Sequence, residues 1–283
     1  MEPITGGKLW SFNGSGGEPE VVRTQDFRKA DACRVSSYLE LATKVAQLQY
    51  KNRSHVLLFR GQSGDYRNRK NYTSLKPSLL RAAPGKLPSA TELLSRFQTL
   101  RAAEHILVRE YEAVGLAGLK ELKRQQIVRW SILQHYEICK TPLLDVTHSL
   151  RIAASFASDA AKDSAYVFIV GVPYLSGGIT ASADVGLQAV RLSSVCPPAA
   201  VRPHIQEGYL LGEYPDLGNI EQRDNYLHAE MDFGRRLIAK FVFNPKTFWT
   251  DENFPVVKRQ ALYPSAKDDP LLGVAERVIA ELK

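Results

Sequence analysis

The sequence lacks the features that define several large protein classes. No apolar run approaches the roughly 18 to 20 residues that a helix needs to cross a bilayer, so we expect no membrane association. The first residues include Glu2 and a Gly/Ser/Glu-rich stretch over 6–20, which does not resemble a signal peptide. The chain has three widely spaced cysteines, Cys33, Cys139 and Cys196, with no CxxC pair. This spacing predicts no disulfide framework and favours a reducing cytoplasm.

Several catalytic signatures are also missing. There is no GxGxxG motif opening a βαβ unit and no phosphate-binding P-loop, which argues against dinucleotide dehydrogenases and NTPases. A GxSxG nucleophile elbow is absent too. The histidines do not fall at i,i+4 spacing and have no cysteine pair to join them, so we expect no metal site.

The composition is that of a globular protein with a basic surface. The chain has 283 residues, of which 44% are hydrophobic and 24% charged, with a formal net charge of +7 that mildly favours an anionic partner. Arg67, Arg69 and Lys70 are close together in one polar loop. They are either a solvated surface or a contact site for nucleic acid or nucleotide phosphates.

Hydrophobic periodicity predicts helices in the first half of the chain and strands mainly in the second. Two expected helices begin at the capping residues Ser37 and Ser89. Three more are expected over 119–138, 150–158 and 271–282. The expected strands are 55–59, 166–172, 189–192, 205–211 and 237–243. This order predicts an α+β fold with a mixed or antiparallel sheet around one core, in a single domain 25–283 after a flexible arm 1–24.

Arg60 is the first candidate functional residue. It follows the apolar run 57–59, so we expect it where a buried strand becomes a loop, and Gly61 would let a ligand approach the backbone. A guanidinium suits phosphate or a ribose hydroxyl. The alternative is a structural salt bridge, to Asp65 or to Asp145.

A second group of polar residues follows Thr141-Pro142. If the segment is extended, Asp145, Thr147 and Ser149 alternate onto one side, where a carboxylate and two hydroxyls could hold a substrate. Alternatively, Thr147 or Ser149 only caps the helix that follows.

Two further positions carry groups that could act in catalysis. His135 could act as an acid or base near neutral pH, although a histidine on the apolar side of a helix is also a common core residue. Gln206 and Glu207 form a polar cluster at an expected strand, and only one of them can face inward.

Taken together, these residues resemble the FRG domain family, named for its Phe-Arg-Gly motif. The resemblance spans roughly 35–210, with a weaker echo at Leu262-Tyr263-Pro264. Val146 stands where the family usually has tryptophan, and Glu207 where a second glutamine is common. The matching residues are Phe59-Arg60-Gly61-Gln62, Pro77-Ser78-Leu79-Leu80-Arg81, Glu104, Gln134-His135-Tyr136, Thr141 through Asp145-Val146-Thr147 to Ser149, and Ala153 to Ala157.

A remoter resemblance is to the arginine-type ADP-ribosyltransferases, which implies an ADP-ribosyltransferase-like split sheet. Arg60-Gly61 is similar to their Arg motif, and 145–149 before Ala153-Ala154-Ser155-Phe156-Ala157 is similar to their Ser-Thr-Ser motif and helix. The resemblance implies that Arg60 binds the NAD pyrophosphate or ribose, and that Thr147 and Ser149 organise the nicotinamide pocket. Glu207, or Gln206, would stabilise the oxocarbenium-like transition state. Gly61, Gln62, Tyr72 and Asp145 complete the expected cofactor-binding set.

The leading hypothesis is therefore an enzyme that consumes NAD as a substrate, without a metal. It would transfer ADP-ribose to a macromolecular acceptor or hydrolyse NAD, as a bacterial toxin or anti-phage effector held in check by an antitoxin or other regulatory partner. One alternative is a non-catalytic nucleic-acid-binding module that uses Arg67, Arg69 and Lys70. Another is a metal-independent nuclease that uses His135, Arg60 and Glu207.

Overall fold

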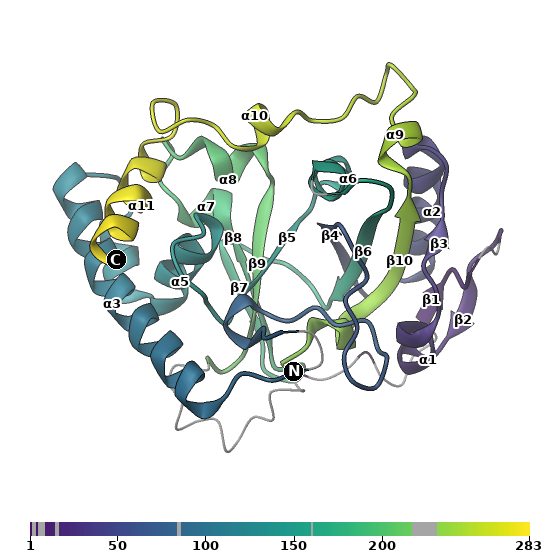
Figure 1. Ribbon diagram of the computed structural model, residues 1–283, viewed down its shortest axis with the longest axis horizontal. Helices are drawn as coiled ribbons and strands as arrows, with labels where there is room; N and C mark the ends of the chain where they lie inside the picture. The colour runs from purple at the N-terminus through teal and green to yellow at the C-terminus, as the bar shows by residue number, and fades with distance from the viewer. Residues whose placement is uncertain (2–3, 5–8, 15–16, 84–85, 160, 217–230) are drawn as a thin grey trace.

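The computed structural model describes residues 1, 4, 9–14, 17–83, 86–159, 161–216 and 231–283 (Figure 1). The strands of its main sheet are β3 (Cys33–Arg34), β4 (Val56–Gln62), β5 (Leu144–Thr147), β6 (Ala165–Val172), β7 (Ile179–Ser182), β8 (Leu187–Arg191), β9 (Gly208–Glu213) and β10 (Leu237–Phe243). The described helices are α1 (Thr24–Lys29), α2 (Tyr38–Lys51), α3 (Ala90–Val114), α4 (Leu119–Arg124), α5 (Gln126–His135), α6 (Leu150–Asp159), α7 (Leu192–Val195), α8 (Val201–Ile205), α9 (Pro245–Phe248), α10 (Arg259–Leu262) and α11 (Pro270–Glu281), with the 3-10 turns η1 (Ser78–Leu80) and η3 (Phe233–Arg236).

The sheet has eight strands in the order β3-β10-β6-β4-β5-β9-β8-β7. All neighbouring strands are antiparallel except β3 and β10, which are parallel. A mixed sheet with helices packed against it confirms the α+β fold class.

The sheet is nearly divided between β4 and β5. These two strands share a single residue pair, Phe59 with Thr147. By contrast, β4 pairs with β6 along all seven of its residues, and β5 pairs with β9 along all four. Beyond Phe59 the facing edges of β4 and β5 separate, so side chains can enter between the two halves of the sheet.

Helices cover the two halves separately, as Figure 1 shows. The buried residues of α3, α5 and α11 form one core with β8 and β9. Those of α2 and α6 form another with β4, β6 and β10. The serine at position 89 and Glu92 make the expected capping box at the start of α3, and Ser37 caps α2.

Helix α6 packs directly on β4 through small residues. A Cβ atom built on Gly61 would lie 1.9 Å from the carbonyl oxygen of Ala153 and 2.7 Å from the amide nitrogen of Ala157. Only glycine therefore fits at this contact, and the alanines of α6 let its backbone reach the strand. The close contact fixes the start of α6 beside the division in the sheet.

Two expected elements differ in the structure. The single helix over 119–138 is wrong: α4 and α5 are separated at Gln125, whose backbone is extended. The change of direction lets Arg129 and Trp130 donate to the buried carboxylate of Glu104, at 2.7 and 2.8 Å. The strand expected over 205–211 starts late, at Gly208, because 201–205 form α8 and Glu207 has a left-handed φ of 45°.

The segment 1–24, which we expected to be a flexible arm, contributes a second, two-stranded antiparallel sheet. Its strands are β1 (Leu9–Ser11) and β2 (Glu20–Val22). Leu9 and Phe12 are buried in the core under α2. Over the described residues, none of the helices has the length and apolar character needed to span a membrane.

Candidate functional site

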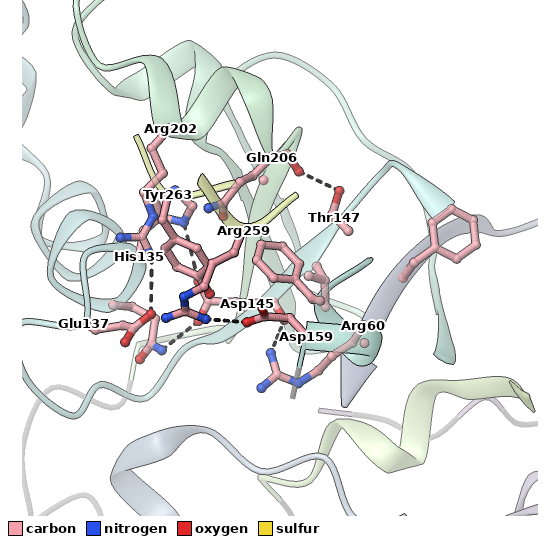
Figure 2. A pocket seen from close by; sticks show the side chains of 16 residues that line it. Arg60, His135, Glu137, Asp145, Thr147, Asp159, Arg202, Gln206, Arg259 and Tyr263 are labelled. Atoms are coloured by element: carbon pink, nitrogen blue, oxygen red, sulfur yellow. Dashed lines mark hydrogen bonds and ion pairs between the residues drawn. The ribbon is translucent and has the colours of Figure 1, made fainter. Parts of the chain in front are cut away.

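A cavity of about 320 Å³ lies where β4 and β5 separate. Its size is within the range of small-molecule sites. It is bounded by β4, β5, the end of α5, α6, α8 and the segment around α10 (Figure 2). Its lining residues are Phe59, Arg60, Gly61, Gln134, His135, Glu137, Asp145, Val146, Thr147, Phe156, Asp159, Arg202, Gln206, Gly208, Arg259 and Tyr263.

Arg60 reaches the cavity from within β4, which continues to Gln62 rather than ending at the arginine. Its Nη1 atom donates a hydrogen bond to the backbone carbonyl oxygen of Asp145 on β5. The Nε atom is buried and has no partner among the described residues. Burial, together with the charge of Arg81, lowers the pKa of Arg60 to about 10, so the guanidinium stays charged at neutral pH.

Arg60 makes neither of the two carboxylate salt bridges that we considered for it. Asp65 pairs instead with the buried Lys240, at 3.1 Å, and with Arg67. Asp145 receives Arg60 at its backbone carbonyl. The side-chain carboxylate of Asp145 is left to other partners.

Those partners are the last residues of α5. Gln134 donates from Nε2 to Oδ2 of Asp145 at 2.7 Å, and Nδ1 of His135 lies 3.7 Å from Oδ1 (Figure 2). Burial alone would raise the pKa of Asp145, but the approach of His135 and the charge of Arg60 lower it below its usual value. The carboxylate is therefore ionised at neutral pH.

His135 is neutral in the same environment. Burial lowers its pKa below the usual value, although the neighbouring Asp145 acts in the opposite direction. Because a carboxylate can only accept, we assign the imidazole proton to Nδ1, which faces Asp145. The buried Nε2 atom then carries a lone pair and has no partner among the described residues. The His135 side chain is 4% exposed, as expected of a core residue, and it also lines the cavity. Its acid–base role stays a prediction.

Thr147 and Gln206 close one side of the cavity and are both buried. Oγ1 of Thr147 donates to the carbonyl oxygen of Gln206 at 2.7 Å and accepts from the amide of Ser149 at 3.0 Å. The threonine therefore orders the turn that precedes α6 and also lines the cavity. Gln206 donates from Nε2 to the carbonyl oxygen of Leu262 at 2.7 Å.

Three lining residues with aromatic or cationic side chains were not among the sequence candidates. Arg202 comes from α8, Arg259 from the first position of α10, and Tyr263 follows α10 directly. The guanidinium carbons of both arginines lie 4.8 Å from the centroid of the Tyr263 ring. The weak family echo at 262–264 was the only sequence signal for this group, because Arg202 and Arg259 stand in no motif.

The structure does not bring every candidate to the cavity. Glu207 is exposed and does not line it, so of the two neighbours Gln206 is the one that faces inward. Gln62, Ser149 and Tyr72 do not line it either. The ring of Tyr72 instead stacks with two basic side chains of α1.

The basic loop lies outside the cavity lining as well. Arg67 is fixed by hydrogen bonds to Asp65 and to the carbonyl oxygens of Lys29 and Ala30. Arg69 and Lys70 are exposed. Arg67 therefore has a structural role in holding the loop against the end of α1.

Part of the chain matches a known domain family. Residues 55–165 match the FRG domain. The match runs from the strand β4 to the first residue of β6 and contains Arg60, His135, Asp145 and Thr147. It ends before Arg202, so the FRG segment supplies one side of the cavity and the later chain supplies the other. Comparison with curated proteins and comparison with solved structures each gave no match.

The described cavity lining carries equal numbers of arginines and carboxylates but no metal-type cluster. Within the described ranges, no group of three or more His, Cys, Asp or Glu side chains is placed to bind a metal ion. Three arginines line the cavity together with an ionised Asp145 and a neutral His135. Glu137 and Asp159 also line it and pair with Arg202 and Arg259, which leaves Arg60 as the lining arginine with no carboxylate ion pair among the described residues. Such a set can bind an anion, stabilise a developing positive charge, and accept a proton.

Proposed function

We propose that this protein consumes NAD, cleaving its nicotinamide–ribose bond to transfer ADP-ribose or to hydrolyse the molecule. The observation that carries the proposal is the pairing of Asp145 with His135 beside Arg60, in a cavity at the division of the sheet. The remote resemblance to arginine-type ADP-ribosyltransferases supports the same chemistry, since Arg60 and Thr147 occupy facing strands there.

The cationic side of the cavity supports binding of the pyrophosphate. Arg60 stays charged and has an unpaired, buried Nε donor beside its bonded Nη1. A guanidinium with free donors binds phosphate oxygens through charge-assisted hydrogen bonds, each stronger than a neutral one. We therefore assign Arg60 to one phosphate of NAD.

Asp145 is our candidate for the carboxylate that assists bond cleavage. The bond between C1′ of the ribose and the ring nitrogen of nicotinamide breaks, and nicotinamide leaves as a neutral molecule with the bonding electrons. The ribose becomes oxocarbenium-like, and an ionised carboxylate close to it lowers the energy of that state. Asp145 takes this role in place of Glu207, whose exposed side chain is outside the cavity.

His135 is our candidate for the base. The incoming hydroxyl, from water or from an acceptor, forms the new bond to C1′ and loses its proton to the Nε2 lone pair of His135. The ionised Asp145 next to Nδ1 stabilises the imidazolium that results. The buried, unpaired Nε2 atom supports this assignment.

Release of nicotinamide tests the proposal. Purified protein is incubated with NAD, alone and with cell lysate, and free nicotinamide is measured. We expect release that Asp145→Asn reduces at least a hundredfold, by analogy with the loss of one electrostatic stabiliser. Dependence on lysate would identify transfer to a macromolecular acceptor rather than hydrolysis. Equal release by wild type and Asp145→Asn would contradict the assigned role.

The unpaired Nε2 of His135 also favours a second candidate, a metal-independent nuclease. A neutral imidazole beside arginines could deprotonate the ribose 2′-hydroxyl, whose oxygen forms a bond to the adjacent phosphorus as the bond to the 5′-oxygen breaks. The imidazolium then gives the proton to the leaving 5′-oxygen. This candidate predicts RNA cleavage in excess chelator that His135→Gln abolishes. RNA left intact by folded wild-type protein would rule it out.

A further inference from the structure

Arg202 is held rigidly in the wall of the cavity opposite Arg60. Figure 2 shows the two arginines on either side of Asp145. The Arg202 guanidinium carbon lies 5.3 Å from the ring centroid of Tyr136 and 4.8 Å from that of Tyr263. Its side chain is only 9% exposed. Stacking on two rings fixes the plane of the guanidinium before any ligand arrives.

The buried carboxylate of Asp269 positions both Arg202 and Tyr136. Oδ2 of Asp269 accepts the backbone amide of Arg202 at 3.1 Å and the hydroxyl of Tyr136 at 2.8 Å. Oδ1 of Asp269 caps the first turn of α11. The buried Asp269 carboxylate is thus used up by scaffold groups, and its bond to Arg202 is to the backbone, not to the guanidinium.

The guanidinium itself is poorly satisfied. Its Nε atom is buried and has no partner among the described residues. Its Nη2 atom donates to Oε1 of Glu137 at 3.2 Å. The side chain of Glu137 is 71% exposed, and its backbone has a left-handed φ of 57°. A buried guanidinium donor without a partner is costly, which points to a ligand that supplies an oxygen acceptor.

We propose that Arg202 is a second phosphate-binding residue of the cavity, and that Glu137 occupies its guanidinium until a phosphate group replaces it. The inference rests on the proposed function, because it uses the same cavity and names a second phosphate contact of its substrates. A planar guanidinium binds two phosphate oxygens side by side, whereas an exposed carboxylate on one nitrogen is a weak partner. Arg259 stacks on the same Tyr263 ring and is ion-paired with Asp159, which also lines the cavity.

The phosphate can come from the NAD-derived donor or from a separate phosphate-bearing acceptor. A competition experiment separates the sources. If ADP-ribose at saturation blocks pyrophosphate binding at Arg202, the donor supplies the group; if it does not, the acceptor does.

Calorimetric titration with inorganic pyrophosphate tests the site on the full chain. We expect Arg202→Gln to weaken binding about tenfold or more, and Glu137→Gln to strengthen it several-fold by removing the competing carboxylate. Arg191→Gln is the matched control, because Arg191 also stacks on a tyrosine, Tyr209, but does not line the cavity. Thermal unfolding confirms that each variant is folded.

The opposite signs of the two substitutions separate recognition from packing. If Arg202 only served packing, Glu137→Gln would not bind pyrophosphate more tightly. Because Glu137 is exposed, the result for Glu137→Gln is decisive even if Arg202→Gln unfolds. Unchanged or weaker binding in Glu137→Gln would overturn the proposal, as would no binding of pyrophosphate to wild type. Pyrophosphate binding that depends on Arg202, in protein that releases no nicotinamide, would uphold the phosphate site and reject NAD cleavage.

Discussion

The guanidinium of Arg60 on β4 donates to the backbone carbonyl of Asp145 on β5, across strands that share one ladder pair. The side chain thus spans the opening at the division of the sheet. It also holds a positive charge beside a carboxylate whose pKa is lowered, and this keeps both groups ionised. The sheet geometry and the electrostatics of the cavity therefore depend on the same arginine.

Gly61→Ala is expected to destabilise the fold strongly. The added methyl group would meet backbone atoms of α6, so helix and strand must move apart. We expect a loss of about 3 kcal/mol or more in the free energy of unfolding, at the upper end for overpacking. Urea denaturation measures it.

Gly64→Ala is the matched control, in the turn that follows β4. A Cβ on Gly64 would meet only the Tyr66 ring, at 3.8 Å, which is ordinary contact. If the two variants unfold at the same urea concentration, the packing account of Gly61 is wrong.

The activity should fall on the acid side through protonation of His135. Its pKa in the folded protein is lowered by burial below the unfolded value of about 6.5, so the imidazole is neutral at pH 7 and becomes charged only at lower pH. The contribution of neutral His135 to the free energy of unfolding is fully present above about pH 6.5 and is lost as the pH falls through the folded pKa. We expect kcat/KM for nicotinamide release to show an acid limb with an apparent pKa below about 6.5.

His135→Gln should remove that limb along with most of the rate. An acid limb that persists unchanged in the residual activity of this variant would assign the titration to another group.

Glu207→Gln should leave nicotinamide release within about twofold of wild type. Its side chain is exposed and outside the cavity, so loss of its charge changes only a distant, screened interaction. A hundredfold loss would instead restore Glu207 to the catalytic role that the family resemblance implies. The rate of nicotinamide release by Asp145→Asn, measured in the same assay, gives the comparison.

The sequence predicted the elements whose local signals agree with the fold. The capping box at Ser89 and the β-branched run of β6 are as expected, because capping and alternation act locally. Glu207 has a left-handed backbone just after the short helix α8, and no residue pattern around it predicts this conformation. Pattern alone therefore put Gln206 and Glu207 on a strand.

The same limit applies to the site. Arg60, His135 and Asp145 lie in the FRG segment and could be selected from their motifs. Arg202 reaches the cavity from α8, just before β9, whereas Arg259 and Tyr263 come from the chain after β10. Their contribution depends on tertiary contacts among residues far apart in sequence, which periodicity does not encode.

The basic loop provides a test of the nucleic-acid alternative. Substituting Lys70 and Arg69 by glutamine should not change nicotinamide release, because neither lines the cavity. If the alternative holds, the double variant weakens binding of a fluorescent oligonucleotide and reduces its salt dependence by about two charges. Binding that is unchanged, or absent in wild type, argues against a nucleic-acid surface on this loop.

The most direct measurement is nicotinamide release from NAD by Arg60→Gln. We predict a rate at least a hundredfold lower than that of wild type, since a charged donor in the cavity is lost. Arg53→Gln, an exposed arginine stacked on Tyr50, should keep the wild-type rate. Release by folded Arg60→Gln at the wild-type rate, or no release by folded wild-type protein with or without lysate, would contradict the account.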